Sequence, residues 1–100
     1  MDKNFLSTLG LARRAGKLLL GVESVQKYRK PVELLIYASD ASPRVKRALS
    51  ERKEPSLSPE LTKEQLGRAV GCKEAAVMAV TDAGFAGMIR NKLELQEENA

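Results

Sequence analysis

The apolar positions of this 100-residue chain follow two patterns. Over residues 3–15, apolar side chains recur every three to four residues, which predicts a helix with one apolar face. Residues 34–38 and 75–80 are instead apolar without interruption, which is typical of strands covered on both faces. These patterns together predict helices on both sides of a sheet. A final helix is predicted to carry Phe85, Met88, Ile89 and Leu93, with Met88 in the core.

The segment between the first helix and the next long apolar run is predicted to hold two short elements. Leu18–Leu20 are predicted to run as a short strand or a buried extended passage, and Gly21 lets the backbone turn into a helix. That helix begins at about Val22 and stops at Pro31, because the residue before a proline is pushed out of the α region.

The first turn of this second helix would leave backbone N–H groups free to bind an anion such as a phosphate. Lys17 precedes the turn and Lys27 follows inside the helix, so both are predicted to flank the anion. The spacing fits equally well a βα junction with solvent-exposed lysines, and both interpretations stay open here.

A short basic helix is predicted from Pro43 to about Lys53, with Ser42 as its N-cap. It is expected to bury Val45, Ala48 and Leu49 and to expose Arg44, Lys46, Arg47 and Arg52. Pro55 and Pro59 then bracket a polar stretch, so any strand there belongs at the edge of the sheet.

Thr62 marks the clearest helix start in the chain. Thr62 and Gln65 have the spacing of a capping box, and Leu61 and Leu66 that of a hydrophobic staple. Gly71 is predicted to end this helix.

The order of elements predicts a three-layer α/β/α sandwich with a small mixed sheet of about four short strands. Residues 1–93 are predicted to form a single domain, and residues 94–100 an acidic, frayed tail.

Composition excludes several classes of function. The chain has no histidine, and Cys72 is its only cysteine, so neither an internal disulfide nor a usual zinc site is expected. We predict no catalytic residue, metal or cofactor. The absence of a long apolar run or a signal-peptide pattern predicts a cytoplasmic protein with no membrane contact.

Charge is distributed unevenly along the chain. Residues 1–53 contain 12 basic and 5 acidic side chains, whereas residues 54–100 contain 5 basic and 8 acidic ones. A basic half of a small domain indicates a polyanionic partner, although a solvated basic surface has the same composition.

Five segments taken in order resemble the kink-turn-binding ribosomal protein superfamily, and most closely its YlxQ-like branch. These segments are 9–17, Gly21 to Lys27, the strand end 38–41, the helix end 66–71 and the segment 79–85. The resemblance extends from about Leu6 to Ile89. It implies a non-catalytic α/β/α domain that binds a sharply bent RNA.

The resemblance also implies which regions bind the RNA. They are the end of the first helix, the start of the second helix, and the loop before the last strand. The residues at these positions are Arg14, Lys17, Gly21, Val22, Glu23, Ser24, Lys27, Cys72, Lys73, Glu74 and Ala75. Kink-turn specialists have Asn-Glu where this chain has Glu23 and Ser24.

Two main functional hypotheses follow. The first is a monomeric module that binds structured, kink-turn-like RNA, associated with the ribosome, its assembly or ribosomal proteins. The alternative is a protein-interaction accessory of the translation machinery that uses the same surface. An RNA-recognition part of an enzyme is a third interpretation, for which this chain lacks the length and a cofactor motif.

Overall fold

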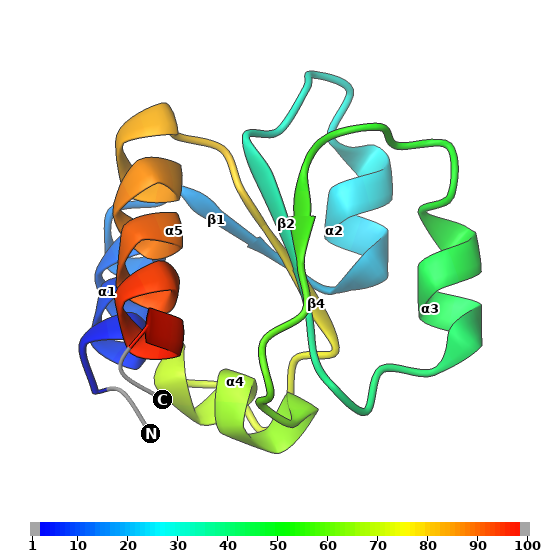
Figure 1. Ribbon diagram of the computed structural model, residues 1–100. Coiled ribbons are helices and arrows are strands. Elements are labelled where there is room, and N and C mark those ends of the chain that lie inside the picture. The colour runs from blue at the N-terminus through cyan, green and yellow to red at the C-terminus, as the bar shows by residue number, and fades with distance from the viewer. Residues whose placement is uncertain (1–2, 99–100) are drawn as a thin grey trace.

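The computed structural model describes residues 3–98, and side chains from Phe5 to Leu93 (Figure 1). It contains five helices and four strands in this part of the chain. In chain order they are α1 (Lys3–Arg14), β1 (Leu18–Leu20), α2 (Gly21–Lys27), β2 (Leu34–Tyr37), α3 (Pro43–Ala48), β3 (Ser56–Leu57), α4 (Lys63–Ala69), β4 (Val77–Val80) and α5 (Ala83–Glu98).

The four strands form one mixed sheet in the order β1-β4-β2-β3. β4 pairs antiparallel with both β1 and β2, and β3 adds to β2 in parallel. The two apolar strands β2 and β4 are therefore central, and all of their residues are buried. The short β3 lies at the sheet edge, as the sequence predicted.

Helices cover both faces of the sheet, so the predicted α/β/α sandwich is confirmed (Figure 1). On one face the core consists of side chains from α1, α4 and α5, with Phe5, Leu66 and Ile89 fully buried. On the other face Val25 of α2 and Leu49, which follows α3, pack against Leu35 and Val77. The alternation of side chains along each strand divides them between the two cores.

Different strands begin and end at the two ends of the sheet. At the upper end in Figure 1, β1, β2 and β3 begin and β4 ends, since Leu18 and Leu34 both pair with Val80. At the lower end β1 and β2 stop and β4 begins, with Leu20 and Ile36 both opposite Met78.

The local signals at α4 are confirmed. The Thr62 hydroxyl accepts a hydrogen bond from Gln65 N at 3.2 Å, and Gln65 Oε1 accepts one from Thr62 N at 2.9 Å. Leu61 and Leu66 are both buried in the same core. A capping box satisfies two backbone donors that a helix start otherwise leaves unpaired.

Two helices end earlier than the sequence predicted. α2 ends at Lys27 instead of Pro31, because the guanidinium of Arg52 donates to the carbonyls of Val25 and Tyr28 and takes the place of the next helical turn. α3 ends at Ala48 instead of Lys53, and the chain then makes the turns that bring Arg52 inward.

Three predictions about individual side chains are wrong. Arg52, expected in solvent, is largely buried in an ion pair, and Ala48, expected in the core, is exposed. Met88 is 45% exposed because it lies on the outer face of α5, whereas Ile89, one residue later, is fully buried.

Helix α5 continues to Glu98 and so includes part of the predicted tail. Within the described residues, no helix combines the length and the apolar character needed to cross a membrane.

Candidate nucleic-acid interface

The start of α2 follows β1 without an intervening loop. Leu20 is the N-cap residue in an extended conformation, and Gly21 has a φ of +84°, which a residue with a side chain rarely adopts. Glu23 and Ser24 are exposed on the first turn, whereas Val25 is fully buried. Glu23 and Ser24, which stand where kink-turn specialists have Asn-Glu, therefore both face solvent.

The loop between α4 and β4 is held close to its helix. Cys72 N donates to Gly67 O at 2.8 Å, and Ala75 N donates to Lys63 O at 2.8 Å. Gly67 has no room for a side chain, since a Cβ there would lie 2.5 Å from the Cα of Glu74. The loop is thereby packed directly on the backbone of α4.

Arg13 ties the same loop to α1. Its Nη1 donates to Val70 O at 2.8 Å and contacts Cys72 Sγ at 3.3 Å. The family resemblance implied Arg14 and not Arg13, which precedes it at the end of α1. Arg14 itself is exposed, so the two arginines have different roles.

Strand pairing brings two of the three predicted regions to the lower end of the sheet. Because Leu20 pairs with Met78 in antiparallel β1 and β4, the next residue, Gly21, lies beside Val77 at the beginning of β4. The first turn of α2 and the loop that precedes Val77 are therefore neighbours. Lys73 and Glu74 are exposed there, Cys72 is half-buried, and Ala75 is buried.

Lys17 does not belong to that group. It precedes β1 at the upper end, where its carbonyl accepts a hydrogen bond from Thr81 N at 3.0 Å. The four-residue span from Lys17 to Gly21 along the strand is about 13 Å. Lys27 is the last residue of α2, about 9 Å along the helix axis from Gly21. The two lysines therefore do not flank the first turn of α2 as predicted.

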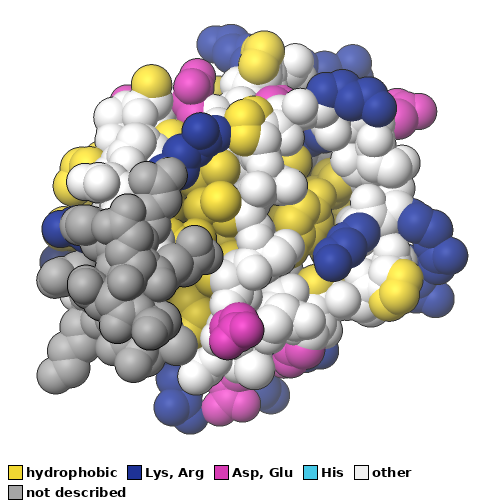
Figure 2. Space-filling view, viewed as in Figure 1, with side chains coloured by type: hydrophobic (Ala, Val, Ile, Leu, Met, Phe, Trp, Pro, Cys, Tyr) yellow, Lys and Arg dark blue, Asp and Glu magenta, His cyan; other side chains and the backbone are white. Residues whose placement is uncertain are grey.

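The ends of the sheet also differ in charge. Near the lower end, exposed side chains of both signs occur together, Glu23 and Glu74 with Lys73. At the upper end and in the segments that begin its strands, exposed cations predominate. They are Lys17, Lys27, Arg29, Lys30 and Lys53. Figure 2 shows Lys and Arg side chains at the top and along the right-hand side, over the loop after α2 and over α3.

Beneath the upper end lies an ion pair between Arg52 and Glu54, with 2.6 Å from Nη1 to Oε2. Burial alone would raise the pKa of Glu54. The hydrogen bonds that its carboxylate accepts from backbone N–H groups, including Val32 N at 3.0 Å, and from Arg52 outweigh burial and hold that pKa below its ordinary value. Burial, followed by repulsion from Glu54, raises the pKa of Tyr37.

No group of three or more His, Cys, Asp or Glu side chains within the described residues is arranged to hold a metal ion. Asp40, between β2 and α3, instead accepts a hydrogen bond from Lys63 N at 2.8 Å, and Asp82, between β4 and α5, accepts one from Phe85 N at 2.9 Å. Both carboxylates therefore stabilise the starts of helices.

Comparison with solved structures shows that another protein has this fold. The chain has the fold of the Giardia lamblia 15.5kD RNA binding protein, with a TM-score of 0.64 and 18% sequence identity over 100% of this chain and 93% of that chain. The fold is thus one that a known RNA-binding protein uses. Neither a scan against protein-family models nor a search of curated proteins found a match.

A second solved structure places the chain in a family. A protein of unknown function from Bacillus halodurans has 34% sequence identity and a TM-score of 0.76, over 93% of this chain and 99% of that chain. The chain belongs to the same family as this Bacillus halodurans protein.

Proposed function

We propose that this protein binds structured RNA of the kink-turn type, as a non-catalytic, ribosome-associated member of the YlxQ-like branch of the kink-turn-binding superfamily. The observation that supports this most directly is the meeting of the first turn of α2 with the loop before β4 at the lower end of the sheet. The Giardia protein, whose name describes RNA binding, has the same fold over the whole chain.

The exposed polar groups at the lower end suit an RNA with extruded or sheared bases. The Glu23 carboxylate accepts hydrogen bonds, and the Ser24 hydroxyl both donates and accepts them. The half-buried Cys72 offers apolar atoms from the loop before β4. Bases that leave the stack can be read on their edges in this way, because they are no longer shielded by the helix.

Basic residues outside the first turn of α2 provide phosphate contacts. Arg14, Lys17 and Lys27 are exposed, so their charges are free to release counterions from an RNA backbone. All four aromatic side chains are at least half-buried: Phe5, Tyr28, Tyr37 and Phe85. Recognition therefore depends on shape and backbone charge, because no exposed ring is available on which bases can stack.

The test is a salt-dependent titration with a kink-turn duplex and with a straight duplex of the same composition. We expect tighter binding of the kink-turn, and a salt slope about one unit shallower for Lys17→Ala and for Lys27→Ala. Arg68→Ala is the control, since Arg68 is exposed on α4 and paired with Glu64. Equal affinity for both duplexes, or unchanged binding in both lysine variants, rejects the proposal.

The mixed charge of the lower end also suits a protein partner, which is the alternative function. Glu23, Lys73 and Glu74 are exposed on the two neighbouring segments, and the rims of protein interfaces are polar in this way. Binding to such a partner through apolar contacts would change little with salt, whereas an RNA complex weakens steeply.

A further inference from the structure

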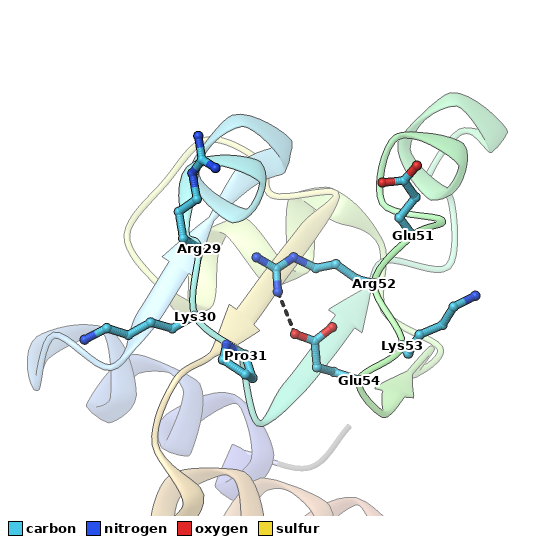
Figure 3. Close-up of a pocket in the computed structure, with 7 residues that line it drawn as sticks. All are labelled: Arg29, Lys30, Pro31, Glu51, Arg52, Lys53 and Glu54. Carbon is cyan, nitrogen blue, oxygen red and sulfur yellow. Dashed lines mark hydrogen bonds and ion pairs between the residues drawn. The ribbon is translucent and has the colours of Figure 1, made fainter.

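Three exposed cations near the upper end, Arg29, Lys30 and Lys53, form a surface that the proposed kink-turn site does not use. Arg29 and Lys30 lie in the loop between α2 and β2, and Lys53 lies in the segment between α3 and β3. These two segments are the walls of an open groove lined by Arg29, Lys30, Pro31, Glu51, Arg52, Lys53 and Glu54 (Figure 3).

The floor of this groove is a closed polar network. Arg52 donates to Glu54 Oε2 at 2.6 Å, to Val25 O at 2.9 Å and to Tyr28 O. The same Glu54 oxygen accepts from Val32 N at 3.0 Å. The arginine is therefore committed to internal partners and is not available to a ligand. The network instead fixes the α2–β2 loop to the segment before β3.

The cations on the walls of the groove remain free. Figure 3 shows Arg29, Lys30 and Lys53 pointing away from the Arg52–Glu54 pair, and all three are exposed. None of them forms an ion pair with another residue in the described part of the chain. Glu51 is the one exposed acid among the groove residues. The hydrogen-bonded floor thus lies between two unpaired cations on one wall and one, Lys53, on the other.

Helix α3 continues the same surface. Its exposed cations are Arg44, Lys46 and Arg47. Gln26 Nε2 donates to Ala48 O at 3.2 Å, which holds the end of α3 against α2. The exposed cations of the α2–α3 layer therefore lie on elements that are connected by hydrogen bonds.

We propose that this groove, together with α3, is a second RNA-backbone surface that contacts the phosphates of a helical arm extending from RNA bound at the kink-turn site. The inference rests on the proposed function. Lys27 supports the continuity of the two sites, because it is the last residue of α2 while the kink-turn site includes the first. Helix α2 is about 10 Å long, so one continuous RNA backbone can contact both sites.

The chemistry of the surface selects a phosphate backbone rather than bases. The groove residues include no aromatic side chain, and three of the four exposed charged side chains are guanidinium or ammonium donors, with Glu51 the one exposed acceptor. Base edges require both donors and acceptors, whereas phosphates accept only. An acidic protein would meet the same cations, and the experiment below separates it from RNA.

The experiment compares two RNAs, a kink-turn with short arms and the same kink-turn with one arm extended by a full helical turn. The protein should bind the extended RNA more tightly, with a salt slope about two units steeper. Lys30→Ala with Lys53→Ala should abolish this difference and leave binding of the short RNA unchanged. Both side chains are exposed, so the Arg52–Glu54 network stays intact.

The control is Lys63→Ala with Arg68→Ala, which removes the same charge from α4 and should keep the full difference between the RNAs. Tight binding of the short RNA with no gain on extension, or a groove variant that behaves like the control, overturns the inference and favours an acidic protein at this surface. Failure of both RNAs to bind overturns the proposed function itself, and this inference with it.

Discussion

Gly67 lies directly against the backbone of Glu74. A Cβ on Gly67 would be 2.5 Å from the Cα of Glu74 and 2.7 Å from its nitrogen. Neither of these atoms is the end of a flexible side chain, so the loop before β4 can lie where it does only because residue 67 has no side chain. The position of one region of the candidate interface thus depends on a helical glycine.

Gly67→Ala is expected to destabilise the protein by about 1–3 kcal/mol, the usual cost of overpacking a filled core. The added methyl group must displace the loop that contains Glu74 and the candidate RNA-binding residues around it. Denaturant unfolding measures the stability, and kink-turn titration measures the effect on binding.

Gly87→Ala is the matched control, because Gly87 is exposed in α5 and a Cβ there meets nothing within 4 Å. Alanine should stabilise that helix by roughly 0.5–1 kcal/mol. Equal effects of the two substitutions would mean that the loop adapts to a side chain at position 67.

Arg13→Ala and Arg14→Ala should separate positioning from phosphate contact. Each removes one positive charge from the end of α1, but only Arg13 donates to Val70 O. Loss of that hydrogen bond, about 1 kcal/mol, should weaken kink-turn binding about fivefold with little change in salt slope. Arg14→Ala should instead make the slope shallower by about one unit. Identical salt profiles would contradict this division of roles.

Glu54→Gln should change how stability depends on pH. The pKa of Glu54 is lower in the folded protein than its ordinary value of 4.5, so its ionised form stabilises the fold above that pH. The contribution is lost as the pH falls through the lowered pKa. The wild type should therefore exceed the variant in stability near neutral pH, with the difference shrinking in acid. Thermal melts of both proteins from pH 7 into the acid range measure it, and a constant difference would refute it.

Restoring the specialists' residues, by Glu23→Asn with Ser24→Glu, should increase affinity for a kink-turn relative to a straight duplex. An amide at position 23 offers both a donor and an acceptor to base edges, and a carboxylate at position 24 accepts from guanine N–H groups. Both positions are exposed, so the fold should not change, which circular dichroism can verify. No gain in selectivity would indicate that the natural RNA has a different geometry.

Hydrogen exchange should be faster from Lys53 to Glu60 than in β2 or β4. β3 has two residues, lies at the sheet edge and is paired on one side only, whereas the two central strands are fully buried. Local opening is easiest where little apolar area is covered. The hydrogen bond from Leu35 N to Pro55 O at 2.9 Å and the contacts of Glu54 with Val32 N and Arg52 anchor the first part of this segment. Exchange as slow as in the central strands would mean that these contacts protect the whole segment.

The central strands and the start of α4 could be predicted from sequence because their signals are local. β2 and β4 are continuous apolar runs, and the partners in the capping box of Thr62 are three residues apart. The three layers followed from the same patterns, since a strand that is apolar on both faces requires cover on both.

Only the tertiary structure decided where α2 and α3 end and how the candidate interface is divided. Arg52 ends α2 by donating to Val25 O, 27 residues earlier in the chain, and such a contact leaves no periodic signal. The register of β1 with β4 separates Lys17 from Gly21 and places Gly21 beside the loop before β4. The sequence predicted which residues belong to the candidate interface. The distances between those residues depend on hydrogen bonds between segments remote in sequence, and spacing along the chain does not encode these bonds.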